Sequence, residues 1–283
     1  MFAEYTIKNT DGTVSCCLCP HHCRLQKGQC GRCRTRYYDG EHVLALAYGQ
    51  CTSAALDPIE KKPLARFRPG SLIVSLGSWG CNFSCPFCQN WQISQQEAAC
   101  QTLTPQQAVA VAKRYVPQGN IGLAYTYNEP SLSFEFIRQT APLIKEAGLV
   151  NVMVSNGYLE EAPLRELLPY IDAWNLDLKG FSAAFYQKYC GAKLAPVLRT
   201  IRLAAAVSHV EVTTLIIPGE NDDAALMAAE AKWLAAIRPD IPLHLTRYFP
   251  RYKMTTPPTA RETLFRLRDV AKQYLAYVYV GNV

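Results

Sequence analysis

Three cysteines in one short stretch of the chain have the spacing of a metal site. Cys81, Cys85 and Cys88 form a CxxxCxxC triplet just after the apolar run 71–76. Thiolates this close together are ligands for an iron–sulfur cluster, in which four cysteines normally hold the metal. The next cysteine is Cys100, twelve residues further on, so one iron would keep an open coordination position, as reactive metal sites do. The alternatives are a zinc knuckle with a borrowed fourth ligand, or three free thiols.

A second group of cysteines lies near the start of the chain. Four of them have the spacing C-x2-C-x3-C-x9-C: Cys16, Cys19, Cys23 and Cys33. Further candidate ligands in the same stretch are Cys17, Cys30, His21 and His22. Four thiolates around a short loop suit tetrahedral zinc or an auxiliary iron–sulfur cluster. Because candidate ligands are in excess, zinc, a second cluster and unmetallated thiols all stay open for this segment.

Composition narrows the class of protein. With 283 residues, 49% hydrophobic and 18% charged, the chain has the size of an α/β barrel and ample residues for a core. No stretch approaches the ~20 apolar residues of a membrane span, and residues 1–10 lack the apolar run of a secretory signal. Twelve cysteines therefore favour metal ligation over disulfides, and we expect a cytoplasmic, oxygen-sensitive enzyme with no membrane partner. The net charge of +6 allows an anionic substrate or nucleic acid but requires neither.

The sequence pattern divides the chain into two parts. Residues 1–68 form a cysteine-rich segment that we expect to bind metal, and residues 69–283 alternate apolar runs with helical patterns. The predicted strands are 72–76, 122–126, 151–155, 173–178, 210–217 and 243–248. The predicted helices are 105–115, 131–147, 160–170, 194–206, 223–237 and 260–274. Six strand–helix alternations predict a parallel α/β fold, but periodicity does not separate a six-unit partial barrel from a doubly wound sheet.

Polar side chains gather where the predicted strands end. Ligands of parallel α/β proteins lie outside the carboxyl ends of the strands. The cysteine triplet follows the first strand. The polar residues at the ends of later strands are Asn128, Glu129, Asn156, Lys179, His244 and Arg247. We therefore expect these residues to meet at one rim and to hold a cofactor there.

The sequence resembles the radical S-adenosylmethionine (SAM) enzymes of the AmmeMemoRadiSam system, relatives of the activating enzymes of glycyl-radical enzymes such as pyruvate formate-lyase. The segments that carry the resemblance are DPIEKKPL at 57–64, GCNFSCPFCQNW at 80–91, TYNEP at 126–130, SNGY at 155–158, DLKGF at 177–181, CG at 190–191 and YVYVGNV at 277–283. The resemblance implies a partial (β/α)6 parallel barrel that carries the cysteine-rich N-terminal segment. It also implies an activase-like radical SAM oxidoreductase.

The resemblance implies how the cofactors bind. The cysteine triplet would hold a [4Fe-4S] cluster, and SAM would bind its open iron through the amino and carboxylate groups. Asn128 and Glu129 fall where such enzymes place the acidic motif that hydrogen-bonds the amino group. Many activases have two glycines before that glutamate, whereas this chain has Tyr127 and Asn128, so the backbone contact there stays open. Alternatively, Glu129 is a first-turn residue favoured by the helix dipole.

Further residues are implied to surround SAM. Ser155 and Asn156 are expected near the ribose or methionine, and His244 near the nucleoside. Lys179 is expected to meet the SAM carboxylate, with Asp177 beside it as an orienting or cation-binding group. Each has a structural alternative: a turn after a strand for Asn156, a local ion pair for Asp177 and Lys179, and a satisfied core histidine for His244.

The resemblance implies the reaction as well. One electron from a reduced flavodoxin or ferredoxin would cleave SAM to methionine and a 5′-deoxyadenosyl radical, which abstracts hydrogen from an unidentified substrate. Alternatively, the enzyme is an activase that places a glycyl radical on a partner protein. Basic and aromatic residues interleave at 247–253 and suggest a nucleic-acid contact, although a loop that caps the barrel is the favoured interpretation. A zinc-stabilised binding module is the non-enzymatic alternative. Cys190 is either a hydrogen-atom donor or substrate contact, or a buried thiol.

Overall fold

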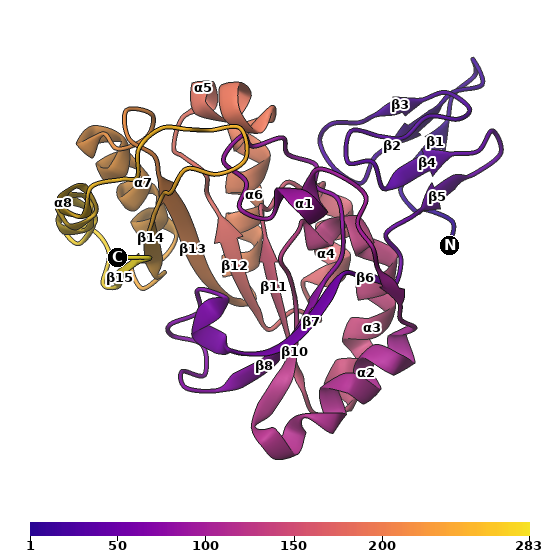
Figure 1. Cartoon of the computed structure of the whole chain (residues 1–283), viewed down its shortest axis with the longest axis horizontal. Helices are drawn as coiled ribbons and strands as arrows, with labels where there is room; N and C mark the ends of the chain where they lie inside the picture. Colours follow the sequence, from indigo (N-terminus) through magenta and orange to yellow (C-terminus); the bar gives the residue numbers. More distant parts are fainter.

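An eight-stranded sheet forms the centre of the computed structural model, which describes residues 1–283 (Figure 1). In order across the sheet, the strands are β15 (Val278–Gly281), β14 (Leu243–Arg247), β13 (His209–Ile216), β12 (Ala173–Asp177), β11 (Val150–Ser155), β10 (Asn120–Thr126), β8 (Leu72–Gly77) and β7 (Ser53–Pro58). All neighbours pair in parallel except β7, which runs antiparallel to β8. Because the order follows the chain without the reversal of a doubly wound sheet, the partial barrel is the correct alternative.

The six predicted strands are confirmed, each to within two residues at either end. Most of their side chains are buried, because parallel strands are covered on both faces and are therefore rich in apolar residues. Two further strands of this sheet were not predicted. β7 exposes most of its side chains, and β15 is only four residues long. The parallel part of the sheet is thus one strand wider than the six-unit prediction.

The six predicted helices are confirmed with small changes at their ends. They are α2 (Pro105–Arg114), α3 (Phe134–Glu146), α4 (Glu161–Leu167), α6 (Leu194–Ala205), α7 (Ala224–Ile237) and α8 (Arg261–Ala271). Shorter helical turns are α1 (Trp91–Ser94), α5 (Ala183–Phe185), the 3-10 helices Ile59–Lys61, Val116–Gln118 and Pro130–Ser133, and the π-helical turn Tyr186–Cys190. The predicted N-cap Thr104 closes a capping box with Gln107. No helix has both the length and the apolar character that crossing a membrane requires.

The cysteine-rich segment folds into small antiparallel sheets beside the barrel, shown in indigo in Figure 1. Its strands are β1 (Thr6–Lys8), β2 (Val14–Cys16), β3 (Arg24–Leu25), β4 (Arg36–Tyr38), β5 (Val43–Ala45) and β6 (Gln50–Cys51), the last of which pairs with β9 (Gln101–Thr102). Cys16, Leu18 and Cys33 belong to the same buried apolar cluster as the barrel core. The segment therefore packs directly on the barrel. A domain boundary at residue 68 stays a prediction, and β7, which precedes it, is part of the main sheet.

A buried ion pair joins the segment to the barrel. Arg36 on β4 donates to both carboxylate oxygens of Glu135 on α3, at 2.6 and 3.0 Å, and both side chains are 1% exposed. Arg36 also donates to Leu132 O at 3.3 Å, and Glu4 N donates to Glu135 Oε1 at 2.8 Å. Bidentate geometry with additional hydrogen bonds is what a buried pair requires to offset its desolvation.

Candidate active site at the carboxyl ends of the strands

A cavity of about 590 Å³ lies at the carboxyl ends of the parallel strands. The cysteine triplet lines it from the loop after β8. The other predicted site residues that line the same cavity are Asn128, Glu129, Asn156, Asp177, Lys179 and His244. Ser155 is buried behind the cavity wall and does not line it. The structure thus brings the cysteines and most of the predicted SAM-binding residues together, while their roles toward SAM stay predictions.

The loop after β8 places the triplet in the cavity wall. Phe83 N donates to Cys81 Sγ at 3.3 Å, and Asn156 Nδ2 lies 3.7 Å from the same sulfur. Contact with Cys190 and burial raise the pKa of Cys85, and burial raises the pKa of the other two thiols. No three His, Cys, Asp or Glu side chains are arranged at the spacing of a formed metal site. Three sulfur donors on one wall nevertheless fit an iron–sulfur cluster, because thiolates are the ligands of such clusters. The positive charge of the irons would compensate the cost of burying the negatively charged thiolates.

Glu129 is buried at the start of the 3-10 helix after β10 and is its N-cap. Its Oε1 accepts from Ser155 Oγ at 2.8 Å and Ser131 N at 3.0 Å, and its Oε2 accepts from Asn156 N at 2.8 Å. Burial raises the pKa of Glu129, although these donors oppose the shift. A carboxylate has about four acceptor sites, so Oε2 keeps capacity for a ligand in the cavity. Glu129 therefore both caps the helix and lines the cavity.

Tyr127 takes a left-handed backbone conformation. Its φ is 73°, in the left-handed region that glycine enters most easily. The hydroxyl donates to Asp57 Oδ2 at 2.6 Å, and Lys62 Nζ lies 4.6 Å from the ring centroid. Lys62 also pairs with Asp57 at 2.8 Å. The DPIEKKPL segment therefore anchors the strained residue beside the site.

Two asparagines fix the cysteine loop from either side. Asn128 accepts from Ser78 N at 3.0 Å and donates to Gly80 O at 3.1 Å. Asn156 donates to Asn82 Oδ1 at 2.8 Å. Amides suit this position because each offers both donors and acceptors. The loop is thus held through the backbone before Cys81 and through the side chain after it.

Asp177 and Lys179 form an ion pair at the end of β12, with Lys179 Nζ 2.9 Å from Asp177 Oδ2. Burial lowers the pKa of Lys179, but the Asp177 carboxylate and the Cys85 sulfur outweigh it, and the pKa lies above its usual value. The ion pair considered from the sequence is therefore present. Both side chains also line the cavity, so the Lys179 ammonium group places a positive charge at the cavity wall.

His244 on β14 contacts both the cavity and the core. Its Nε2 lies 2.6 Å from Glu211 Oε2, and its ring stacks on Tyr279 with 5.1 Å between centroids. Glu211 is fully buried and also contacts His209 at 2.9 Å. Burial opposes ionisation of Glu211, but its bonds with His209 and His244 lower its pKa to about 2. The core-histidine role is thus observed for a residue that also lines the cavity.

Sequence reasoning missed several cavity residues on the last strands. The additional polar side chains there include Thr213, Thr246, Tyr279 and Asn282. Thr246 follows His244 by two positions on β14, and side chains two positions apart point to the same face of a strand. The alternation of inward-facing positions was therefore a signal that could have found Thr246.

The basic and aromatic segment at 247–253 folds over the cysteine loop. Tyr252 stacks on Trp91, with 5.2 Å between centroids and 14° between planes. Lys253 N donates to Pro86 O at 2.9 Å. A ring that is already stacked is less available to a nucleic-acid base. These contacts favour the capping-loop interpretation.

Cys190 lies at the end of the π-helical turn and is fully buried beside Cys85. Such turns occur frequently near functional sites. The thiol does not line the cavity. Its position agrees with a buried thiol rather than with a substrate contact.

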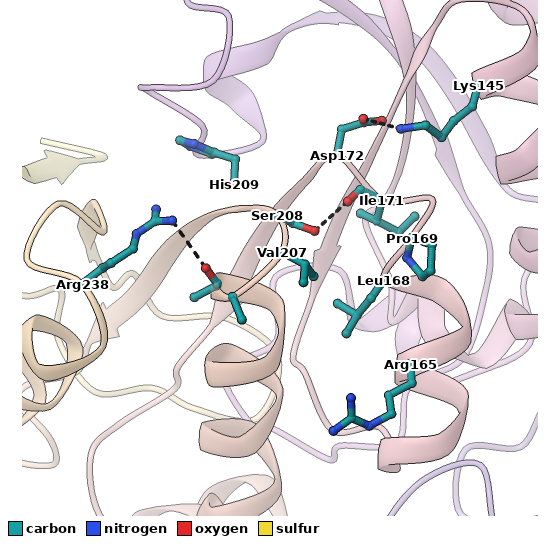
Figure 2. A pocket seen from close by; sticks show the side chains of 12 residues that line it. Lys145, Arg165, Leu168, Pro169, Ile171, Asp172, Val207, Ser208, His209 and Arg238 are labelled. Atoms are coloured by element: carbon teal, nitrogen blue, oxygen red, sulfur yellow. Dashed lines mark hydrogen bonds and ion pairs between the residues drawn. The ribbon is translucent and has the colours of Figure 1, made fainter.

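A larger hollow of about 840 Å³ lies at the opposite, amino-terminal edge of the strands (Figure 2). Its polar groups are engaged by the protein: Lys145 pairs with Asp172 at 2.7 Å, and Arg238 Nη1 donates to Ala205 O at 3.4 Å. No residue of the predicted site lines this hollow. It is therefore no candidate for the active site.

The family model of the Radical SAM superfamily matches residues 78–231, and the chain belongs to this superfamily. It is 43% identical over 290 residues to "Uncharacterized protein MJ0808" of Methanocaldococcus jannaschii, a match that covers 100% of this chain and 84% of that protein. It is 25% identical over 112 residues to the (2S)-3-sulfopropanediol dehydratase activating enzyme of Klebsiella oxytoca, covering 39% of this chain and 35% of that enzyme. A solved domain of pyruvate-formate lyase-activating enzyme from Bacteroides vulgatus matches with a TM-score of 0.50 and 22% identity, covering 57% of this chain and 99% of that domain.

Membership of the superfamily makes the chain an enzyme of radical chemistry and implies a [4Fe-4S] cluster and SAM as cofactors. The prediction of an activase-like radical SAM enzyme is confirmed at this level, as is the radical SAM fold. A purely structural zinc module is thereby excluded as the identity of the chain. The narrower assignment to the AmmeMemoRadiSam system stays a prediction.

Proposed function

We propose that this chain cleaves SAM reductively and abstracts hydrogen from a substrate. The observation that carries the proposal is one cavity that combines the cysteine triplet with Glu129, Lys179 and His244. Cys81, Cys85 and Cys88 would hold the [4Fe-4S] cluster. When bound, the cluster and SAM supply a 5′-deoxyadenosyl radical after the transfer of one electron.

The residues around the cavity bind and orient SAM in this proposal. Glu129 Oε2, which accepts one protein hydrogen bond, accepts a second from the SAM amino group, and Asn128 fixes the backbone beside it. Lys179, which Asp177 orients at 2.9 Å, donates to the SAM carboxylate. A charge-assisted bond of this kind is among the stronger hydrogen bonds in proteins.

Ser155, Asn156 and His244 have different positions and therefore different proposed roles. Ser155 does not line the cavity and donates to Glu129, so it orients the carboxylate. Asn156 touches the Cys81 sulfur at 3.7 Å and lies between the cysteine loop and the methionine or ribose of SAM. His244, fixed by Glu211 at 2.6 Å, faces the nucleoside.

Exclusion of water is the remaining task of the chain. The loop at 247–253 covers the cysteine loop through the Tyr252–Trp91 stack. Aromatic surface at this point keeps solvent away from the triplet, and a dry site prevents the loss of reactive intermediates. A reduced flavodoxin or ferredoxin is the proposed electron donor.

In a second candidate function, the substrate is a partner protein. The 25% identity to an activating enzyme of Klebsiella oxytoca favours an activase that places a glycyl radical on its partner. A copurifying protein that develops a glycyl radical signal under reducing conditions with SAM supports this candidate. Copurifying RNA instead supports a nucleic-acid substrate held by the 247–253 loop.

The first experiment tests SAM cleavage directly. The protein is reconstituted with iron and sulfide without oxygen, reduced with dithionite, and assayed for 5′-deoxyadenosine. We expect product from the wild type and from Cys100→Ala, an exposed cysteine outside the cavity, but none from Cys88→Ala. Equal product from Cys88→Ala, or the absence of any cluster in the wild type, refutes the proposal.

A further inference from the structure

Four of the seven cysteines in the N-terminal segment face one small cavity. Its lining includes Cys16, Cys19, Cys23 and Cys33, but neither Cys17 nor Cys30. Cys16 ends β2, Cys19 and Cys23 lie in the turn that leads to β3, and Cys33 precedes β4. The fold therefore brings the four thiols with the C-x2-C-x3-C-x9-C spacing to one cavity, where His21 is the one other candidate ligand in the lining, and its Nε2 is engaged by Asn82 O. None of the four is in a disulfide.

Two of the four sulfurs accept a hydrogen bond from the surrounding chain: Arg32 N donates to Cys23 Sγ at 3.4 Å, and Thr35 Oγ1 donates to Cys33 Sγ at 3.3 Å. Such donors suit the thiolate, which is the form of cysteine that binds metal. Partners of this kind also hold metal ligands in their orientation. The site thus has both the ligands and the groups that orient them.

The size of the cavity favours one ion over a cluster. Its volume is about 10 Å³, which is close to the space occupied by one water-sized sphere. The active-site cavity, at about 590 Å³, is far larger. A single ion fits the small cavity, whereas a cube of iron and sulfur requires its walls to move apart. Four thiolates around one ion are the usual ligands of structural zinc.

We propose that Cys16, Cys19, Cys23 and Cys33 bind one Zn²⁺ ion in a closed, structural site. The four side chains are not drawn together to the spacing of a filled site, so binding includes a rotation of the thiols toward the centre of the cavity and the release of their protons. Arg32 and Arg36 also line the cavity and place positive charge beside the thiolates.

The zinc site lies directly behind the loop of the cysteine triplet. A methyl group on Gly80 would lie 2.4 Å from Thr35 Cγ2 and 2.9 Å from Cys33 O, so the two loops are in close contact. His21 Nε2 donates to Asn82 O at 2.7 Å, and Arg32 Nη2 donates to Ser84 Oγ at 3.2 Å. The zinc site therefore braces the loop that carries Cys81 and Cys85. Its existence does not rest on the proposed reaction.

Metal analysis of a variant without the triplet tests the site separately from the catalytic cluster. The variant Cys81→Ala, Cys85→Ala and Cys88→Ala is reconstituted with iron, sulfide and zinc, and its metal content is measured. We expect one zinc per chain and no iron–sulfur absorbance. Bound iron with sulfide, or no zinc, overturns the proposal. Co²⁺ in place of zinc should give the absorption of a tetrahedral ion with sulfur ligands; octahedral Co²⁺ also overturns it.

Single substitutions in the same variant identify the ligands. Cys19→Ser should lower the bound zinc at least severalfold, whereas Cys17→Ser and Cys30→Ser should retain it, because their thiols do not line the cavity. A Cys19→Ser protein with full zinc content overturns the ligand set, as does loss of zinc from either control. If Cys19→Ser does not fold, the metal content and the Co²⁺ spectrum of the parent variant still decide the proposal.

Discussion

Neutralising Glu135 should cause a large loss of stability. Glu135→Gln preserves the size of the side chain but leaves Arg36 charged and 1% exposed. Two charges about 4 Å apart attract by about 4 kcal/mol at an effective dielectric constant of about 20. Removing one partner of a buried pair costs about 3–5 kcal/mol, because the remaining charge stays buried. We therefore expect the free energy of unfolding to fall by about 4 kcal/mol.

Urea unfolding followed by tryptophan fluorescence measures this loss. Glu161→Gln is the matched control, since it breaks an ion pair with Arg165 at 2.7 Å whose side chains are 45% and 59% exposed. Exposed pairs at this spacing contribute only about 0.3–0.5 kcal/mol. A loss for Glu135→Gln no larger than for Glu161→Gln refutes the reasoning about burial.

A double substitution separates charge from packing. Arg36→Met combined with Glu135→Leu removes both charges and keeps apolar volume at the contact. Replacing a buried pair by apolar residues is often neutral or stabilising, so the double variant should regain most of the stability lost in Glu135→Gln. A double variant as unstable as the single one shows that geometry, and not the unpaired charge, causes the loss.

Two further predictions use the same unfolding assay. Glu230 on α7 is buried against Thr214, and burial raises its pKa to about 8 from 4.5. Because the folded state then binds more protons than the unfolded chain between these values, stability falls as the pH rises from 4.5 to 8, by on the order of 5 kcal/mol. Glu230→Gln should remove this fall, and an unchanged pH profile counts against the raised pKa. Tyr127→Phe loses the bond to Asp57 at 2.6 Å and should cost about 2 kcal/mol. Tyr37→Phe, at a half-buried position of β4, serves as its control, and an equal loss there contradicts the prediction.

The interior of the fold was predictable and its edges were not. β10 and β11 are rich in apolar residues because both of their faces are covered. β7 has only one buried side chain, that of Asp57, so no apolar run marks it. Its extended form depends on pairing with β8, and strand preference at an edge follows such tertiary contacts more than local sequence.

The rim of the site was predictable, whereas most of its supporting contacts were not. The triplet and Glu129 follow strand ends, which the sequence pattern locates. Glu211, the partner of His244, is 33 residues away in the chain, and it was not predicted. Contacts between neighbouring strands depend on register, which apolar runs without alternation specify poorly. The bond between Tyr127 and Asp57 spans 70 residues. It was missed because Asp57 lies on β7, a strand that no apolar run marks and that is separated from β10 by β8.

The position of the N-terminal cysteines affects the order in which the protein assembles. Cys16 and Cys33 are 17 positions apart, so a loop between them closes at small entropic cost. The partners of this segment in the barrel, such as Asn82 for His21 and Glu135 for Arg36, are synthesised later. Metal capture can therefore fold this segment while the barrel is still incomplete, since binding free energy becomes folding free energy. Docking onto the finished barrel is then a late step, and until it occurs Arg36 lacks its partner and Gly80 lacks the surface against which it packs.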